Sequence, residues 1–307
     1  MQHRSRWGGT FLALVAWSVS AAAPTVHAQQ IDQWPNAPQP DTGRQVVPFM
    51  EGWYDNGDGT HTISMGYLNR NPNEVIEIPL GEHNYIDPPR YDGVQPTTFL
   101  GSRNRGMFAI TVPDSELSED IWWYITMPNG ETYKVPGRTS ANAYQLDWMP
   151  RPHGSLPPLM WFDSERDAEK GPGGVWADDA IQARVGQPVT IEVHVNDVSE
   201  RDPNDSRFAE PIPVHVVFSK YQGPPGEVTF TRHPSTPEPE PGFRGRMPGP
   251  EEVTLDGVSG TARVNATFEA PGEYVIFAKS DNFGAPDSAD GDQCCWTNAY
   301  QRVVVSQ

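Results

Sequence analysis

The two cysteines of the chain stand side by side, at Cys294 and Cys295. Neighbouring Cα atoms lie about 3.8 Å apart across a trans peptide, below the usual disulfide range of about 4.4–6.8 Å, so a vicinal disulfide is strained and more easily reduced. An oxidising compartment still favours it, as a brace at the entry to the last strand beside Trp296. A redox pair or links to another chain are the alternatives. A soft-metal site lacks further ligands nearby.

Carboxylates crowd the same stretch, at Asp281, Asp287, Asp290 and Asp292. Clustered carboxylates repel one another unless a cation neutralises them, and calcium prefers such oxygen ligands. The spacing meets no calcium-loop rule, so composition alone favours a solvated acidic loop. The sequence therefore predicts no cofactor, with calcium as the alternative. A second acidic turn, at 55–59, fails the same rule because its register lacks the closing Glu.

Trp122, Trp123 and Tyr124 form a third group, consecutive in the sequence. Neighbouring side chains on a strand point to opposite faces, so at least one large ring lies outside the core unless both faces are covered. An exposed ring could stack on a sugar or dock a partner protein. The alternative is a strand buried on both sides, with Trp161 and Phe162 as the covering residues.

No catalytic motif accompanies these groups. The sequence contains no His-Glu-x-x-His run, nucleophile elbow, phosphate-binding loop or dinucleotide fingerprint. The histidines that follow residue 28 are dispersed, and surface or core-edge positions suit them. A site assembled from distant loops stays open, because catalytic groups need only be close in space. The alternative to a non-enzyme is therefore a metal-assisted hydrolase with its site between two modules.

The elements that must position these groups are strands. Residues 53–69 predict a β-hairpin, because Asn, Gly and Asp at 55–59 suit a tight turn that needs positive φ angles. In the second arm, Ile63, Met65 and Tyr67 alternate with Thr62, Ser64 and Gly66, the pattern of a half-buried strand.

The ends and the charge limit the classes of protein. His3, Arg4 and Arg6, an apolar run from Phe11 to Ala23 and a small-x-small site predict a signal peptide over 1–28, cleaved after Ala28. No later segment reaches the ~20 apolar residues that span a bilayer. We expect a periplasmic or secreted protein. The net charge of −18 opposes nucleic-acid binding, because such a surface repels phosphate.

The number and spacing of short strand patterns predict an all-β protein of two antiparallel, immunoglobulin-like β-sandwich modules. The 32 prolines and 28 glycines oppose long helices and favour turns. We expect an extended leader at 29–44, a first module at 45–148, a Pro/Gly-rich connector at 149–175 and a second module at 176–307. The expected strands are 46–54, 60–69, 74–80, 107–112, 121–127, 131–135, 189–195, 212–219, 227–232, 251–255, 262–268, 274–279 and 303–305.

The first module resembles a β-domain of large bacterial secreted and surface proteins. Its pattern of a DNGDGT hairpin with FGY-N, then GQPT-F, then GR has counterparts at 55–69, 93–99 and 137–138. His61 stands where the family has Tyr, and Val94 is inserted after Gly93. The resemblance implies an extracellular building block without established catalysis. The second module resembles a bacterial immunoglobulin-like domain in its Pro271-Gly272-Glu273-Tyr274 strand entry.

Together these features predict a non-catalytic binding or assembly protein of the bacterial envelope or secreted fraction. An envelope protein or a polysaccharide is the expected partner. A carbohydrate-binding accessory protein falls within this class, with Trp122, Trp123 and Tyr124 as the contact residues. The metal-assisted hydrolase is the alternative from a different class.

Overall fold

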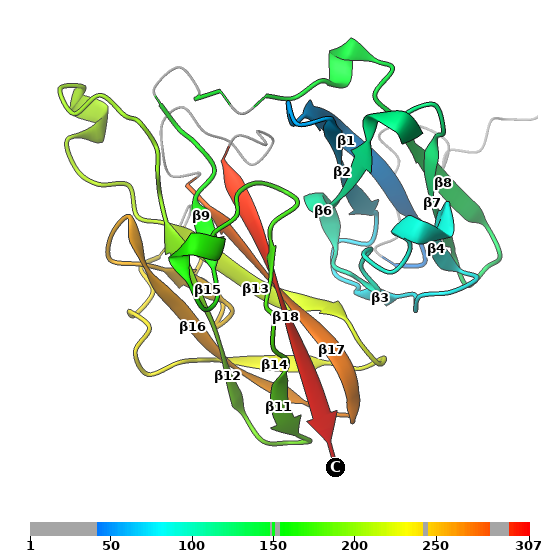
Figure 1. Cartoon of the computed structure of the whole chain (residues 1–307). Helices are drawn as coiled ribbons and strands as arrows, with labels where there is room; N and C mark the ends of the chain where they lie inside the picture. The colour runs from blue at the N-terminus through cyan, green and yellow to red at the C-terminus, as the bar shows by residue number, and fades with distance from the viewer. Residues whose placement is uncertain (1–41, 148, 151–153, 242–244, 283–294) are drawn as a thin grey trace, which may run out of the picture. The chain divides into compact units, whose positions relative to one another are not determined.

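Two β-sandwiches follow one another in the computed structural model, which describes residues 42–147, 149–150, 154–241, 245–282 and 295–307 (Figure 1). This confirms the all-β, immunoglobulin-like prediction. The regular helices in the described part are single 3₁₀ turns, and none of its helices is long and apolar enough to cross a membrane. The turns are η2 (Pro89–Tyr91), η3 (Asp114–Glu116), η4 (Asn142–Tyr144), η5 (Glu165–Asp167) and η6 (Ser206–Phe208).

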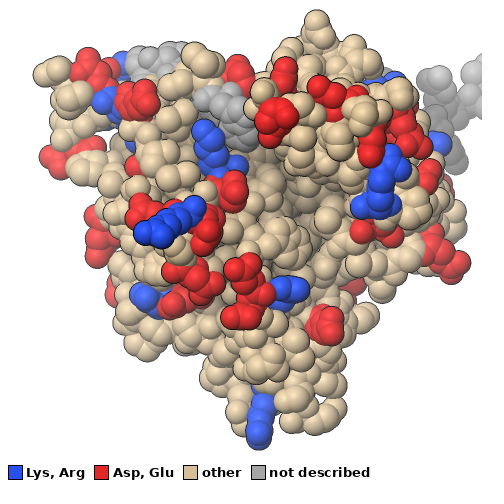
Figure 2. All heavy atoms as spheres, in the orientation of Figure 1, with Lys and Arg blue, Asp and Glu red and all other residues tan. Residues whose placement is uncertain are grey.

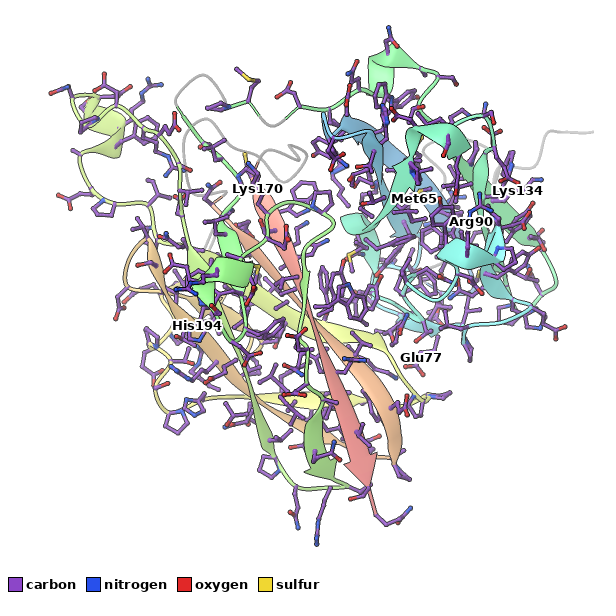
Figure 3. The ribbon with its side chains drawn as sticks, in the orientation of Figure 1. Met65, Glu77, Arg90, Lys134, Lys170 and His194 are labelled. Atoms are coloured by element: carbon purple, nitrogen blue, oxygen red, sulfur yellow. The ribbon has the colours of Figure 1, made fainter. Side chains whose placement is uncertain are left out.

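The first sandwich packs two three-stranded antiparallel sheets, ordered β1-β2-β6 and β4-β7-β8, with a short ribbon β3-β5. Its strands are β1 (Val46–Asp55), β2 (Thr60–Asn69), β3 (Ile76–Glu77), β4 (Asn84–Asp87), β5 (Thr98–Phe99), β6 (Ser102–Pro113), β7 (Ile121–Thr126) and β8 (Thr132–Gly137). Met65 lies inside this sandwich (Figure 3).

The second sandwich packs the sheet β14-β16-β12-β9 against the sheet β10-β18-β17-β13-β15, in which β11 also pairs with β18. Its strands are β9 (Leu159–Trp161), β10 (Val175–Trp176), β11 (Ile181–Arg184), β12 (Val189–Asn196), β13 (His215–Gln222), β14 (Val228–Arg232), β15 (Glu252–Thr254), β16 (Ser259–Phe268), β17 (Gly272–Asp281) and β18 (Trp296–Ser306).

Strand order identifies both sandwiches as immunoglobulin-like. In the second sandwich, the strands other than the short β10, β11 and β15 can be lettered A to G in chain order: β9, β12, β13, β14, β16, β17 and β18. They form sheets ABED and CFG, the arrangement of a constant-type domain. In the first sandwich, β1, β2 and β6 match A, B and E, and β4, β7 and β8 match C, F and G. The two sandwiches therefore share a topology as well as a class.

The turn between β1 and β2 forms as the sequence predicts. Gly57 and Gly59 adopt φ angles of 73° and 88°, which glycine tolerates without a steric penalty. The Asp55 carboxylate accepts the Gly57 amide at 2.9 Å, and the Asp58 carboxylate accepts the Thr60 amide at 3.0 Å. These side-chain bonds hold the turn and use carboxylate oxygens that a cation would otherwise need.

Strand β2 differs from its prediction as a half-buried strand. The strand is buried on both faces from Thr62 to Tyr67. At Gly66, the face expected to meet solvent is covered by the Glu51 carboxylate and by the carbonyl of Asn104, where the β6 register shifts. A Cβ at residue 66 would lie 2.5 Å from that carbonyl oxygen. Glycine is thus required here for close approach.

We predict that Gly66→Ala lowers the free energy of unfolding by about 1–3 kcal/mol, because the added methyl group overpacks a site bounded by main chain. Urea denaturation measures the change. Gly257→Ala is the matched control, since its Cβ meets nothing within 4 Å. Equal effects of the two substitutions would contradict the packing argument.

Strands β17 and β18 are buried on both faces, and this joins the two sandwiches. On β17, Ile276 and Ala278 belong to the core of the second sandwich, whereas Val275 and Phe277 belong to the core of the first. Tyr221 of β13 and Tyr300 of β18 also enter the first core. All described residues accordingly fall within one compact unit.

Hydrogen bonds reinforce this shared core. The Tyr221 hydroxyl donates to the Val94 carbonyl at 2.5 Å, and the Tyr300 hydroxyl donates to the Met107 carbonyl at 2.8 Å. Burial raises the pKa of both phenols, so they remain protonated donors at neutral pH. The Gln222 amide donates to carbonyls of the segment 93–95.

The segment expected to be a connector contributes strands to the second sandwich. β9 pairs with β12, and β10 pairs in parallel with β18. Trp161 stacks on His194 of β12 with ring centroids 5.5 Å apart, and Phe162 packs against the second core. These two aromatic residues therefore cover the second sandwich and not the Trp122–Tyr124 strand.

A buried ion pair also crosses between the sandwiches. The ammonium group of Lys220, whose side chain is 6% exposed, binds the Glu77 carboxylate and the carbonyls of Pro224 and Gly226. Figure 3 labels Glu77 at the edge of the first sandwich. Breaking such a pair leaves a buried charge with only neutral partners.

We predict that Glu77→Gln lowers the free energy of unfolding by about 2–3 kcal/mol, somewhat less than a fully buried pair, because Glu77 is partly exposed. Chemical denaturation provides the measurement. Glu119→Gln, which breaks the exposed pair of Glu119 with Arg90, should have little effect, because solvent screens an exposed pair. If the two substitutions cost the same, the pair has no structural role.

Candidate functional site

An aromatic cluster lies on the outer face of the sheet β4-β7-β8. Tyr85 stands opposite Tyr124, and Tyr124 stands opposite Lys134, so the three side chains cross the sheet in one row. The rings of Tyr85 and Tyr124 stack with centroids 4.6 Å apart and planes within 9°. Trp122 lies two residues along β7, with its ring 6.4 Å from that of Tyr124. We call Tyr85, Trp122, Tyr124 and Lys134 the aromatic face.

Lys134 covers part of this face. Its ammonium group lies 4.3 Å from the centroid of the Trp122 ring and 5.2 Å from that of Tyr124. Figure 3 shows Lys134 at the outer rim of the first sandwich. Arg138 approaches Trp122 at 5.9 Å and also pairs with Asp120 at 2.6 Å. The cluster therefore combines half-buried rings with an exposed, flexible cation.

Trp123 points the other way and is fully buried. Its indole N–H donates to the Asn84 side chain at 3.0 Å, and its ring meets Phe108 edge-on at 5.0 Å. The same side chain of Asn84 donates to the carbonyls of Ile78 and Pro96. Trp123 thus supports the aromatic face from beneath, and only Trp122 and Tyr124 of the predicted trio reach solvent.

Two members of the aromatic face were missing from the sequence prediction. Tyr85 lies in β4, a strand of four residues before Pro88 that the alternation pattern does not reveal. Lys134 lies in a predicted strand, but no residue near it in the sequence indicates its contact with Trp122 and Tyr124. Both residues come close to Trp122 and Tyr124 because of the register in which the strands pair. In the sequence, only the short strand-like run Asn84–Asp87 could have indicated the additional strand.

The acidic stretch before β18 is described only at Asp281. Asp287, Asp290 and Asp292 lie outside the described residues, so calcium binding there stays a prediction. Asp281 is 7% exposed and lies 3.3 Å from Nδ1 of His215. The Nε2 atom of His215 lies 4.0 Å from the Glu252 carboxylate, which Arg246 also pairs with.

Burial by itself lowers the pKa of His215, but the hydrogen bond and charge of Asp281, joined by the charge of Glu252, outweigh it. The net shift raises the pKa above the ordinary value of 6.5. A raised pKa means that the charged imidazole stabilises the fold below the unfolded-state pKa. That contribution disappears as pH rises through the folded-state pKa.

We therefore predict that His215→Gln lowers the free energy of unfolding more at pH 5.5 than at pH 8.5. Urea denaturation across this range gives the difference between the variant and the wild type. His83→Gln, at an exposed histidine, serves as the control for a general histidine effect. A difference that does not change with pH would contradict the assigned interaction.

Cys295 is fully buried and disulfide-bonded. Cys294 lies outside the described residues, so the vicinal pairing stays a prediction. Trp296 follows directly at the start of β18 and is also fully buried. The Lys279 ammonium lies 3.8 Å from the Trp296 ring centroid.

The described histidines are engaged locally. His61 lies 3.0 Å from the Asp114 carboxylate, and His194 lies 2.8 Å from the Thr261 hydroxyl. Within the described ranges, no three His, Cys, Asp or Glu side chains gather closely enough to hold a metal ion. Figure 2 shows acidic side chains spread over the visible face, with basic ones among them.

No protein-family model and no curated protein matches the chain. Among solved structures, the D00-D0 domain of intimin aligns at 11% identity and a TM-score of 0.25, covering 86% of this chain and 100% of that one. The D0-D1 domain of intimin aligns at 12% and 0.23, covering 85% and 97%. A titin A168-A169 structure aligns at 12% and 0.21, covering 85% and 100%. The immunoglobulin-like assignment stands on the strand order of this chain itself.

Proposed function

We propose that this protein is a non-catalytic extracytoplasmic binding protein of the bacterial envelope, which holds a polysaccharide on the aromatic face. The observation that carries this proposal is the row of Tyr85, Tyr124 and Lys134 beside Trp122 on one outer sheet face. Aromatic rings outside a core offer large apolar area at low entropic cost. Sugar rings have an apolar C–H face that stacks on such surfaces.

Lys134 presents only a small barrier to a ligand. An exposed cation–π contact is worth about 0.5–1 kcal/mol, so a sugar displaces the ammonium group from the Trp122 ring at little cost. The displaced Lys134 can then donate hydrogen bonds to hydroxyl groups beside the ring. In the free protein, the same side chain shields Trp122 from unspecific apolar association.

The aromatic face rests on a stiff support. Strands β4 and β7 carry buried residues on the inner face of the sheet β4-β7-β8, and Trp123 is held there by Asn84 and Phe108. Side chains mounted on a packed sheet lose little conformational freedom on binding. The partly buried phenol of Tyr85 is kept neutral because burial, Tyr124 and Asp87 raise its pKa. It therefore stays a hydrogen-bond donor.

The location is part of the proposal. The predicted signal peptide over 1–28 lies outside the described residues, and the acidic composition suits a protein that stays soluble near other envelope components. The disulfide at Cys295 is consistent with an oxidising compartment.

We expect Trp122→Ala and Tyr124→Ala each to reduce retention on a bound polysaccharide at least fivefold, because each removes stacking area. Affinity electrophoresis in gels that contain soluble glucans, xylans or chitosan, and sedimentation with insoluble cellulose, chitin and peptidoglycan, measure retention. Trp176→Ala removes an equally large, partly exposed ring elsewhere and should leave retention unchanged.

Trp123→Ala serves a different purpose. It should lower the free energy of unfolding by about 3–5 kcal/mol, because it empties a buried site.

Wild-type retention by both Trp122→Ala and Tyr124→Ala would overturn the proposed surface. Metal analysis and a hydrolase screen of the same wild-type preparation would test the alternative prediction of a metal-assisted hydrolase.

A further inference from the structure

A groove of about 940 Å³ opens between the β3-β6 side of the first sandwich and strands β13 and β14 of the second. It lies apart from the aromatic face and shares no lining residue with it. Its walls include Val75, Leu100 and Met107 from the first sandwich and Val217 and Phe230 from the second. Val75, which lines the groove, is 53% exposed.

Two strand edges border this groove. Among the described residues, β14 pairs with β16 on one side and with no strand on the other. β15 covers the edge of β13 only over His215–Val217, with one more bond from the Phe218 amide to Glu251. Unpaired edges carry main-chain donors and acceptors that can pair with an added strand.

The charged side chains of the groove are distributed unevenly. Arg103, Arg105 and Lys279 lie toward β6 and β17, whereas Glu227 and Glu251 lie beside β14 and β15. Arg103 is neutralised by Glu51 at 2.7 Å. In the part of the chain that the structure describes, no hydrogen bond or ion pair of the Arg105 guanidinium is found. The Arg105 charge acts on the Glu51 carboxylate only at longer range, because Glu51 forms its ion pair with Arg103. A basic group outside any ion pair of the described residues stands out in a chain of net charge −18.

We propose that this groove binds an extended peptide segment of a partner protein, which pairs its main chain with the open edge of β14 and places a carboxylate at Arg105. The open edge supplies main-chain hydrogen bonds, as in other complexes formed by strand addition. The apolar wall of Val75, Leu100 and Phe230 accepts alternate side chains of the added strand. Arg105 sets the direction, because an acidic residue at the opposite end would face Glu227 and Glu251.

The test uses the mature chain and fluorescein-labelled peptide probes. One probe is a nine-residue peptide of alternating Val and Thr that ends in two Asp residues, and a second ends in two Lys residues. A third repeats the acidic probe with alternate amides N-methylated, which prevents strand pairing. Fluorescence anisotropy should show saturable binding of the acidic probe and at least tenfold weaker binding of the other two.

Two matched pairs of variants localise the binding. Arg105→Glu should weaken binding of the acidic probe at least tenfold, whereas Arg166→Glu, at an exposed arginine outside the groove, should not. Thr229→Trp should block the groove, whereas Thr231→Trp, on the same strand but outside the lining, should not. All four positions are partly or fully exposed, so the variants should fold, and circular dichroism checks this.

Several outcomes would overturn the proposal. Absence of saturable binding of the acidic probe by the wild type is one, and equal binding of the N-methylated probe is another. An acidic probe that binds Arg105→Glu and Thr229→Trp as well as the wild type binds elsewhere. Self-association of the wild type that Thr229→Trp abolishes, without any probe binding, would identify a second copy of this chain as the occupant.

Discussion

Burial of β17 and β18 on both faces is the constraint on which the rest of the structure depends. In most sandwiches of this type, one face of each sheet meets solvent, and polar residues alternate with apolar ones. Here Phe277, Tyr221 and Tyr300 form an aromatic group with ring centroids 5.2–5.6 Å apart on the face that enters the first core. Because a large apolar interface resists relative motion of domains, the two sandwiches hold the surfaces between them in a defined geometry.

The segment 93–99 helps to join the two sandwiches. The Gly93 and Gln95 carbonyls accept the Gln222 amide, and the Thr97 amide donates to the Tyr221 carbonyl at 2.9 Å. Gln95 itself is fully buried. The motif at 93–99, on which the resemblance to secreted β-domains is based, thus forms part of the contact with the second sandwich. Its main-chain carbonyls and the Thr97 amide hold the two sandwiches together.

One face of β7 belongs to the core, and the other carries the proposed binding surface. Trp123 and its hydrogen bond to Asn84 anchor the inner face, whereas Trp122 and Tyr124 lie half-buried outside with Tyr85 and Lys134. A rigid inner layer lets the outer rings keep one arrangement without a ligand. The groove between the sandwiches depends on the same rigidity, because its two walls come from different sandwiches.

The sequence by itself determined the features that depend on neighbouring residues. Glycine and aspartate at 55–59 specify the hairpin through φ preferences and side-chain bonds to nearby amides, and alternation predicts β12 and β16 because one face of each meets a core. The strands β4, β5, β9, β10 and β11 escaped prediction, since each is too short for its period to be read.

Only the tertiary structure decided which faces are covered. The sequence shows the same alternation whether the outer face of β2 meets solvent or lies under Glu51, and it does not show that Phe277 enters a neighbouring core. It also does not show that Tyr85 and Tyr124 stack, because they meet only through the pairing of β4 with β7. Local preferences act over a few residues, whereas burial and register arise from contacts between segments far apart in the chain.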